Sequence, residues 1–288
     1  MSRNNSGKPL NDFLNMHFSR RGLLKSSLLG GGAVFARGLF GSLIPTAGWS
    51  ADAASKYETP PVETASGKLR GVIQGGVYTF RGVPYAASTA GTNRFMPPRN
   101  VEPWTGVRDA FQNGPTAPQL AAPPNPLILG HRAPAVEGED CLALNIFTPN
   151  AIGKRPVMVW LHGGGFAGGA GSAHAFDGTN LARTGDVVVV TVNHRLNIFG
   201  YLYLADVAGE KYADSGNAGM LDIVAALQWT RENIAHFGGD PTNVTLFGQS
   251  GGGYKVSTLL GMPPTKGLIH KAIIESGSGL KGVRREDA

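Results

Sequence analysis

The run Val187–Val192 is the feature of the sequence that most limits the possible folds. It reads Val-Val-Val-Val-Thr-Val, with no alternation of apolar and polar residues, so we expect a strand buried on both faces. Strands of that kind are typical of a mostly parallel sheet covered by helices on both sides. Four more short apolar runs, bounded by Gly, Asn or Pro, are predicted strands: residues 142–147, 156–161, 243–247 and 271–274.

Helical spacing between two of these runs supports the same α/β class. Apolar residues recur at i, i+3, i+4 and i+7 from about Ala218 to Phe237, and the cluster Gly238–Pro241 ends the predicted helix. Upstream, residues 68–73 and 76–81 alternate around a Gly-rich turn and predict an antiparallel hairpin. Residues 113–138 are rich in Pro, Ala and Gly without a clear period, which predicts a long surface loop.

The first 53 residues resemble an export signal. Arg20-Arg21 is followed by two uncharged stretches, separated by Arg37, and then by Ala51-Asp52-Ala53, which suits signal cleavage. A disordered basic tail or a short membrane helix is the alternative, but both apolar halves are too short to span a bilayer comfortably. We therefore expect a twin-arginine signal peptide over 1–53, a mature chain over 54–288 that is periplasmic or secreted, and no stable membrane anchor.

Charge and cysteine content narrow the possible partners. The net charge is +6, but +4 of it lies in residues 1–53, so the remainder gives no reason to expect nucleic acid as a partner. The single cysteine, Cys141, cannot form an intrachain disulfide and is interpreted as a buried small hydrophobe. We see no cluster of metal ligands and no cofactor loop, and expect no cofactor. The oligomeric state is left open.

The segment Gly248-Gln249-Ser250-Gly251-Gly252 carries the strongest chemical signal. It joins the predicted strand 243–247 to a predicted helix, so Ser250 falls on a sharp strand-to-helix turn. G-x-S-x-G in that setting is a nucleophile elbow, and α/β folds place chemistry at the carboxyl ends of their strands. Ser250 is therefore the candidate catalytic nucleophile.

A second glycine motif supplies what such a serine needs. The predicted strand 156–161 runs into His162-Gly163-Gly164-Gly165-Phe166, where backbone N–H groups can approach a substrate oxygen without obstruction. The expected oxyanion donors are the N–H groups of Gly164, Gly165 and Gly251. A flexible loop or a phosphate-binding loop is the alternative, but the chain has no G-x-x-x-x-G-K-[ST] string.

The chain resembles the type-B carboxylesterases, the carboxylesterase/cholinesterase family of α/β-hydrolases. The strings that carry the resemblance are FRGVPYA (80–86), EDCLALN (139–145), WLHGGGF (160–166), NHRL (193–196) and FGGDPTNVTLFGQS (237–250). They run in family order and cover only the N-terminal half of that family. The resemblance implies ester hydrolysis of small-molecule carboxylic esters through an acyl-serine intermediate, and a structural ion pair between Arg94 and Glu139.

Three positions depart from the family pattern. Gln249 stands where most members have Glu, which removes one negative charge. Gly251 replaces a small Ala, a change we expect to be harmless for an N–H donor. Ala117 stands where many members have the cysteine that bonds the equivalent of Cys141, so we expect the loop between them to be mobile.

The fourth departure concerns the rest of the catalytic triad. In this fold the acid and then the histidine follow the nucleophile, yet only 38 residues follow Ser250. His270 begins a predicted strand and is not expected to act as the base; Glu275 lies in the same strand, and His162 and His194 match structural positions. We therefore expect the triad acid and histidine to be absent and the chain to be a fragment of a serine esterase. An inert or binding protein on the esterase fold is the alternative; a complete small HGGG lipase agrees less well with the family strings.

Overall fold

The computed structural model describes residues 57–120 and 136–279. The predicted signal, residues 1–53, and the centre of the predicted surface loop, 121–135, lie outside the described residues. None of the helices in the described ranges is long and apolar enough to cross a membrane.

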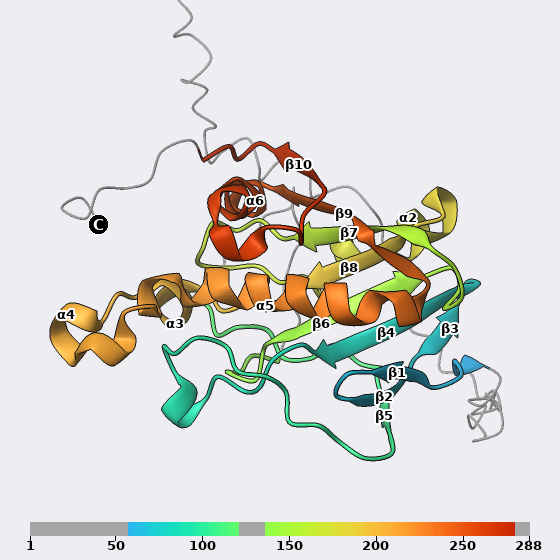
Figure 1. Cartoon of the computed structure of the whole chain (residues 1–288), viewed down its shortest axis with the longest axis horizontal. Helices are drawn as coiled ribbons and strands as arrows, with labels where there is room; N and C mark the ends of the chain where they lie inside the picture. The colour runs from blue at the N-terminus through green and yellow to red at the C-terminus, as the bar shows by residue number, and fades with distance from the viewer. Residues whose placement is uncertain (1–56, 121–135, 280–288) are drawn as a thin grey trace, which may run out of the picture. The chain divides into compact units, whose positions relative to one another are not determined.

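A seven-stranded sheet forms the centre of the molecule, in the order β10-β9-β7-β8-β6-β4-β3 (Figure 1). Strands β7 to β10 run parallel to one another, whereas β6, β4 and β3 continue the sheet in antiparallel pairs. The fold prediction is thereby confirmed. The strands of this sheet are β3 (Val72–Gln74), β4 (Val77–Pro84), β6 (Ala143–Thr148), β7 (Arg155–Leu161), β8 (Val188–Val192), β9 (Gly239–Gln249) and β10 (Lys271–Glu275).

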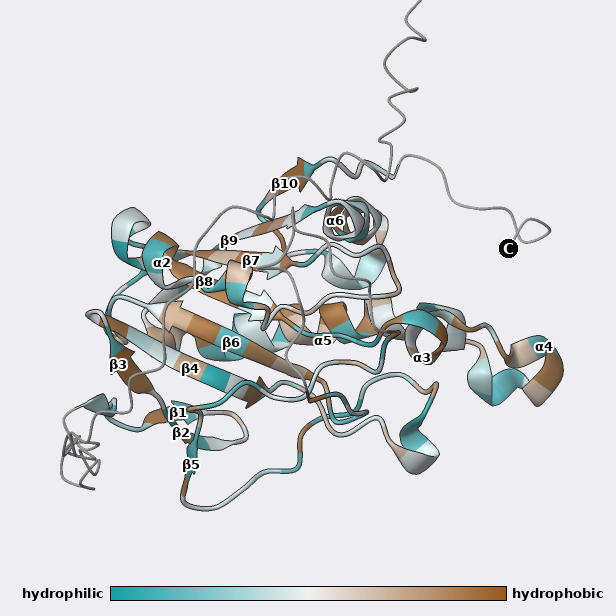
Figure 2. Ribbon diagram, turned by 180° about the vertical axis from the view of Figure 1, so that it is seen from behind, coloured by the Kyte–Doolittle hydropathy of each residue, from teal (hydrophilic) through white to brown (hydrophobic). Residues whose placement is uncertain are grey.

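Strand β8 is buried on both faces, as its unbroken Val run predicts. Val188, Val190 and Val192 belong to the main core. Val189 points the other way, into a smaller cluster with Phe147 and Ala182. Figure 2 shows hydrophobic colouring along β6, the neighbour of β8 in the sheet, and also on the edge strands β3 and β10.

Helices cover both faces of the sheet. Helices α5 (Ala218–Asn233) and α6 (Gly251–Gly261) pack on the main-core face, and α2 (Thr179–Gly185) packs behind β4, β6 and β8. The predicted end of α5 is confirmed: a 3-10 turn follows over Ile234–Phe237, and Gly238 takes the left-handed conformation that ends it. The short helices α3 (Asn197–Tyr201) and α4 (Ala205–Ala208) lie between β8 and α5.

The predicted N-terminal hairpin is only half right. Strands β3 and β4 pair across Gly75 and Gly76 as expected. The segment before them instead forms β2 (Gly67–Arg70), which joins β1 (Val62–Thr64) and β5 (Val107–Asp109) in a separate three-stranded sheet. The chain changes sheet at Gly71, where a Cβ atom would collide with the carbonyl oxygen of Thr79.

The described ends of the 113–138 loop contain neither helix nor strand, as predicted, apart from an isolated bridge between Thr116 and Glu137. They are held in place by side-chain hydrogen bonds. Gln119 accepts a hydrogen bond from the Gly169 N–H at 2.8 Å and donates one to its carbonyl oxygen at 3.0 Å. The mobility expected of the loop between Ala117 and Cys141 stays a prediction, and residues 121–135 of that loop lie outside the described ranges.

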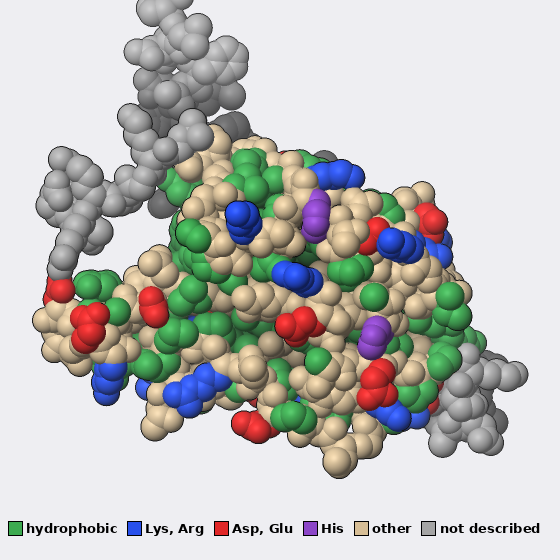
Figure 3. All heavy atoms as spheres, in the orientation of Figure 1, with side chains coloured by type: hydrophobic (Ala, Val, Ile, Leu, Met, Phe, Trp, Pro, Cys, Tyr) green, Lys and Arg blue, Asp and Glu red, His purple; other side chains and the backbone are tan. Residues whose placement is uncertain are grey.

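The surface that carries α5 and α6 is mixed in character. Acidic and basic side chains are scattered over it among hydrophobic ones (Figure 3). Positive and negative side chains are interspersed, and this face carries no large patch of one charge.

Candidate active site

Ser250 occupies a strained turn between β9 and α6. Its backbone has φ +55° and ψ −122°, outside the conformations that a residue with a side chain prefers. Two hydrogen bonds hold it there: its N–H donates to the Glu275 carbonyl at 2.8 Å, and its own carbonyl accepts from the Tyr254 N–H at 3.0 Å. The turn therefore projects the serine beyond the carboxyl end of the sheet.

Glycines allow the neighbouring backbone to pack closely around this turn. A Cβ atom at Gly252 would collide with the Leu161 carbonyl at the end of β7. At Gly251 it would collide with the backbone of Gly165. An Ala does not fit at position 251 unless the loop shifts, while the N–H role expected of Gly251 stays a prediction.

The loop after β7 lies directly against Ser250. A Cβ atom at Gly163 would stand 3.4 Å from that of Ser250. Gly164 and Gly165 have φ values of +94° and +64°, which glycine alone adopts readily. Among the described residues, none accepts a hydrogen bond from the N–H groups of Gly164, Gly165 or Gly251. The structure thus brings together the four predicted residues, and these N–H groups are free to bind an oxyanion.

Lys255 reaches the same loop from α6. Its side chain is fully buried, and its Nζ atom donates a hydrogen bond to the Gly165 carbonyl oxygen at 2.7 Å. The Nζ atom also lies 5.0 Å from the centre of the Phe166 ring. Burial lowers the pKa of Lys255 to about 7.

Two buried histidines with neutral rings stand behind the loop. The rings of His162 and His194 stack with their centres 4.8 Å apart. Each Nδ1 faces a backbone carbonyl oxygen, at 2.8 Å and 2.9 Å, and so carries the ring proton. Burial, and then the charge of Lys255, lowers the pKa of His162 to about 3 and that of His194 well below its usual value. Both rings are therefore neutral, in agreement with the structural role expected for them.

His270 and Glu275 lie at opposite ends of β10. The ring Nδ1 of His270 accepts a hydrogen bond from the Val244 N–H at 3.2 Å. Val244 lies six residues before Ser250, a separation of roughly 20 Å along a strand. Glu275 pairs with Gln249 beside the elbow, but its side chain is exposed. Among the described residues, no side chain is hydrogen-bonded to the Ser250 hydroxyl, so the structure places no base there.

The predicted structural residues are found as expected. Arg94 and Glu139 form a two-pronged ion pair, with Nε and Oε2 2.7 Å apart. Cys141 is a free, buried thiol, and burial raises its pKa to about 12.

Sequence reasoning missed Lys255 and a buried ion pair between Arg195 and Asp222. Asp222 lies inside the apolar stripe of α5, and Lys255 lies beside Val256 and four residues before Leu259 on the buried face of α6. A charged residue on a stripe that is otherwise buried is the signal that could have identified both.

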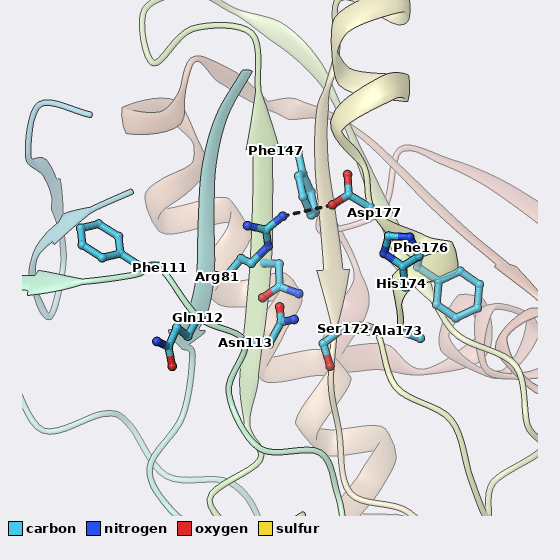
Figure 4. Close-up of a pocket in the computed structure, with 12 residues that line it drawn as sticks. Arg81, Phe111, Gln112, Asn113, Phe147, Ser172, Ala173, His174, Phe176 and Asp177 are labelled. Carbon is cyan, nitrogen blue, oxygen red and sulfur yellow. Dashed lines mark hydrogen bonds and ion pairs between the residues drawn. The ribbon is translucent and has the colours of Figure 1, made fainter. Parts of the chain in front are cut away.

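Two hollows in the described surface lie away from this site. One, of about 510 Å³, is walled by β4, β6 and the chain before α2, where Arg81 and Asp177 form an ion pair at 3.1 Å (Figure 4). None of its lining residues belongs to the elbow or to the Gly163–Gly165 loop. Across residues 57–120 and 136–279, no group of three or more His, Cys, Asp or Glu is placed to hold a metal ion.

Comparison with known proteins points to one family. A family model described as the carboxylesterase family matches residues 58–286. The para-nitrobenzyl esterase of Bacillus subtilis is 48% identical over 218 residues, which cover 75% of this chain and 43% of that protein. The phenmedipham hydrolase of Pseudarthrobacter oxydans is 43% identical, with the same coverage.

Solved structures give the same result. The carboxylesterase of Geobacillus stearothermophilus superposes with a TM-score of 0.71 at 48% identity, over 77% of this chain and 44% of that one. An esterase from Clostridium hathewayi, described as hydrolysing aliphatic aromatic polyesters, has a TM-score of 0.70 at 50% identity, over 74% and 42%. The chain thus spans less than half the length of the relatives it matches.

Proposed function

Since the chain belongs to the carboxylesterase family, we propose that it carries the nucleophile and the oxyanion hole of a carboxylic-ester hydrolase. The observation that carries the proposal is the strained turn at Ser250, packed against the Gly163–Gly165 loop. Residues that hold such a conformation in a tight glycine setting are concentrated at functional sites. The proposed substrates are small-molecule carboxylic esters, and no cofactor is needed.

The proposed chemistry begins with attack of Ser250 Oγ on the ester carbonyl carbon. As the new C–O bond forms, the carbonyl π electrons move to oxygen, and the N–H groups of Gly164, Gly165 and Gly251 hold the negative charge. Collapse of this intermediate breaks the C–O bond to the leaving group, which departs as an alkoxide and takes a proton from solvent. The acyl-serine that remains is hydrolysed by water to the acid and free serine.

Proton transfer limits what this chain does alone. The serine proton needs an acceptor, and the described residues place no imidazole against Ser250 Oγ. We propose that, with none of the described residues placed to accept this proton, solvent accepts it, so acylation is slow and hydrolysis of the acyl-serine slower still. Oxyanion donors and substrate binding sustain some catalysis without a complete triad, but the rate is orders of magnitude below that of an enzyme with the intact triad.

The test treats the full chain with p-nitrophenyl acetate and follows both nitrophenolate release and the mass of the protein. We expect about one acetyl group per chain on Ser250, followed by a much slower steady rate. Ser250→Ala abolishes the adduct. Ser257→Ala is the matched control, because Ser257 lies on α6 with its hydroxyl bonded to the Gly253 carbonyl at 3.1 Å.

Two results would contradict the proposal. Acetylation that persists in Ser250→Ala would place the nucleophile elsewhere, and a wild-type chain without an adduct would favour a binding protein on the esterase fold. Sustained turnover at rates typical of esterases would contradict only the view that the chain lacks its base.

We also propose that the protein is periplasmic or secreted by twin-arginine export. The proposal rests on Arg20-Arg21 and the Ala51-Asp52-Ala53 site, and a protein without disulfides suits export in the folded state. Replacing Arg20 and Arg21 by Lys should retain the chain at its full length inside the cell. Export of that variant at the wild-type level would exclude the twin-arginine route.

A further inference from the structure

Two features of α6 meet at Gly165, a residue of the proposed oxyanion loop. The first is the lack of a side chain at Gly251, which lets the Gly165 backbone approach the start of the helix. The second is Lys255, one turn further along, whose Nζ atom donates to the Gly165 carbonyl oxygen at 2.7 Å. The approach of the loop and the bond that holds it come from the same helix.

The loop needs an anchor at this point. Gly164 and Gly165 both have positive φ, and glycine backbone has more freedom to lose on ordering than any other residue. On either side the loop is fixed by backbone hydrogen bonds: the Gly164 carbonyl accepts from the Gly168 N–H at 3.1 Å, and the Phe166 carbonyl accepts from the Asn197 N–H at 2.7 Å. Among the described residues, the Gly165 carbonyl is held by Lys255.

Within residues 57–120 and 136–279, no carboxylate forms an ion pair with the cation that provides this bond. His162 at the end of β7 and His194 after β8 feel its charge, and burial keeps both neutral. Among the described residues, burial is what shifts the pKa of Lys255, and no carboxylate opposes it. The carboxylates on the described elements packed against α6 form no ion pair with Lys255. The titratable side chains on α6 and on these elements are Arg155 (β7), Asp240 (β9), Lys271 and Glu275 (β10), Asp222, Arg231 and Glu232 (α5) and Tyr254 (α6).

We propose that Lys255 is a positioning residue for the oxyanion hole: by holding the Gly165 carbonyl against α6, it keeps the N–H groups of Gly164 and Gly165 turned toward an ester bound at Ser250. The proposal deepens the proposed esterase function and rests on it. A buried cation kept for a backbone carbonyl alone is costly, which argues for a task beyond stability.

A consequence follows for the pH dependence of acylation. Lys255 in its ammonium form donates a stronger hydrogen bond and adds positive charge behind the forming oxyanion. Burial brings the pKa of that ammonium to about 7, so this assistance is present below pH 7 and lost above it. Attack by Ser250 itself becomes easier as pH rises, so the two effects oppose each other near neutrality.

The experiment compares three variants of the full chain with wild type. Lys255→Met keeps the length of the side chain without a donor, and Lys255→Gln keeps a neutral donor. Lys266→Met is the matched control, because Lys266 is exposed. Deuterium exchange of the peptide spanning 162–169 reports the order of the loop, and the rate of Ser250 acetylation by p-nitrophenyl acetate is measured from pH 5 to pH 9.

In Lys255→Met we expect exchange in the 162–169 peptide to rise and acetylation below pH 6 to slow about tenfold, less than the loss of a direct oxyanion donor. The wild-type profile of log rate against pH should bend near pH 7, and the profiles of Lys255→Met and Lys255→Gln should not. Lys255→Gln should restore much of the exchange protection. A purely structural lysine would leave the shape of the profile unchanged in all variants.

The proposal is overturned if Lys255→Met leaves loop exchange at the wild-type level, or if it keeps the bend near pH 7. If Lys255→Met does not fold, the pH profiles of wild type and Lys255→Gln still test the proposal. A wild-type profile without a bend near pH 7 also overturns it. Failure of the esterase function is a separate result. It would show as no acetylation of wild-type Ser250, while the exchange experiment would still report whether Lys255 orders the loop.

Discussion

Arg195 and Lys255 are both cations inside the core, but their surroundings differ. Arg195 is only 1% exposed and faces Asp222, with Nη2 and Oδ1 2.6 Å apart and Nε and Oδ2 2.8 Å apart. Lys255 is 0% exposed and faces a carbonyl oxygen. Burial alone would lower the pKa of Arg195, but the bonds and charge of Asp222 outweigh it, whereas nothing offsets burial at Lys255.

The difference separates an ion that fixes the fold from one that can change state. Asp222 also accepts a hydrogen bond from the Arg195 backbone N–H at 3.0 Å, so the pair ties the chain after β8 to α5. Burial raises the pKa of the Asp222 carboxyl, while the hydrogen bonds and charge of Arg195 favour its ionised form. Lys255, bound to a dipole instead of a charge, can lose its proton near neutrality while remaining in place.

Removing the counter-charge of Arg195 should have the largest effect. Asp222→Asn keeps the volume but leaves the guanidinium buried without an anion, which we expect to cost about 3–5 kcal/mol of the free energy of unfolding. Denaturant unfolding at pH 7 measures it, with Asp214→Asn, an exposed position, as the control. A loss below about 1 kcal/mol would mean that the pair is weaker than its geometry implies.

The stability of the protein should depend on pH through Lys255 and not through Arg195. The folded-state pKa of Lys255, about 7, lies below that of an unfolded lysine, so between about pH 7 and pH 10 the unfolded chain binds the extra proton. Stability from this group therefore rises with pH across that window, by at most about 1.4 kcal/mol per pH unit, and is level below it.

The measurement is the difference in unfolding free energy between wild type and Lys255→Met at pH 7, 8, 9 and 10. The contributions of the other titrating groups are common to both proteins and cancel in this difference. We expect the difference to shift steadily in favour of wild type as pH rises. A constant difference would show that Lys255 remains charged in the folded state.

The same contrast explains which parts of the molecule the sequence predicts well. The parallel strands, α5 and the elbow can be predicted from local sequence signals. The run Val187–Val192 indicates burial on both faces, and the glycines around Ser250 indicate close packing of the backbone. The strand over 68–73 was wrongly extended, because the change of sheet at Gly71 depends on the distant Thr79 carbonyl.

The charges inside the core depend on partners that are far away in the sequence. Asp222 lies 27 residues from Arg195, and Gly165 lies 90 residues from Lys255. In the sequence these residues appear as charged positions in an otherwise apolar helix face, and the pattern does not identify what they bind. Glycine and valine patterns thus predict the site's backbone, while its electrostatics requires the folded structure.

Arg94 is paired with a carboxylate, as Arg195 is, but its partner Glu139 and its own side chain are partly exposed. Breaking this ion pair should have the smallest effect on the free energy of unfolding. The side chains are 44% and 19% exposed, and the guanidinium lies 5.9 Å from the Phe199 ring. Because water and salt screen such a pair, we expect Glu139→Gln to lower the unfolding free energy by about 0.3–1 kcal/mol at low salt. A double-mutant cycle with Arg94→Gln, repeated at 1 M salt, isolates the coupling. A coupling as large as the loss in Asp222→Asn, or one that is unchanged at 1 M salt, would show that pairing rather than burial sets the contribution of these ion pairs to stability. The contrast between Arg195 and Lys255 would then follow from the presence or absence of a carboxylate partner, without reference to the low dielectric of the core.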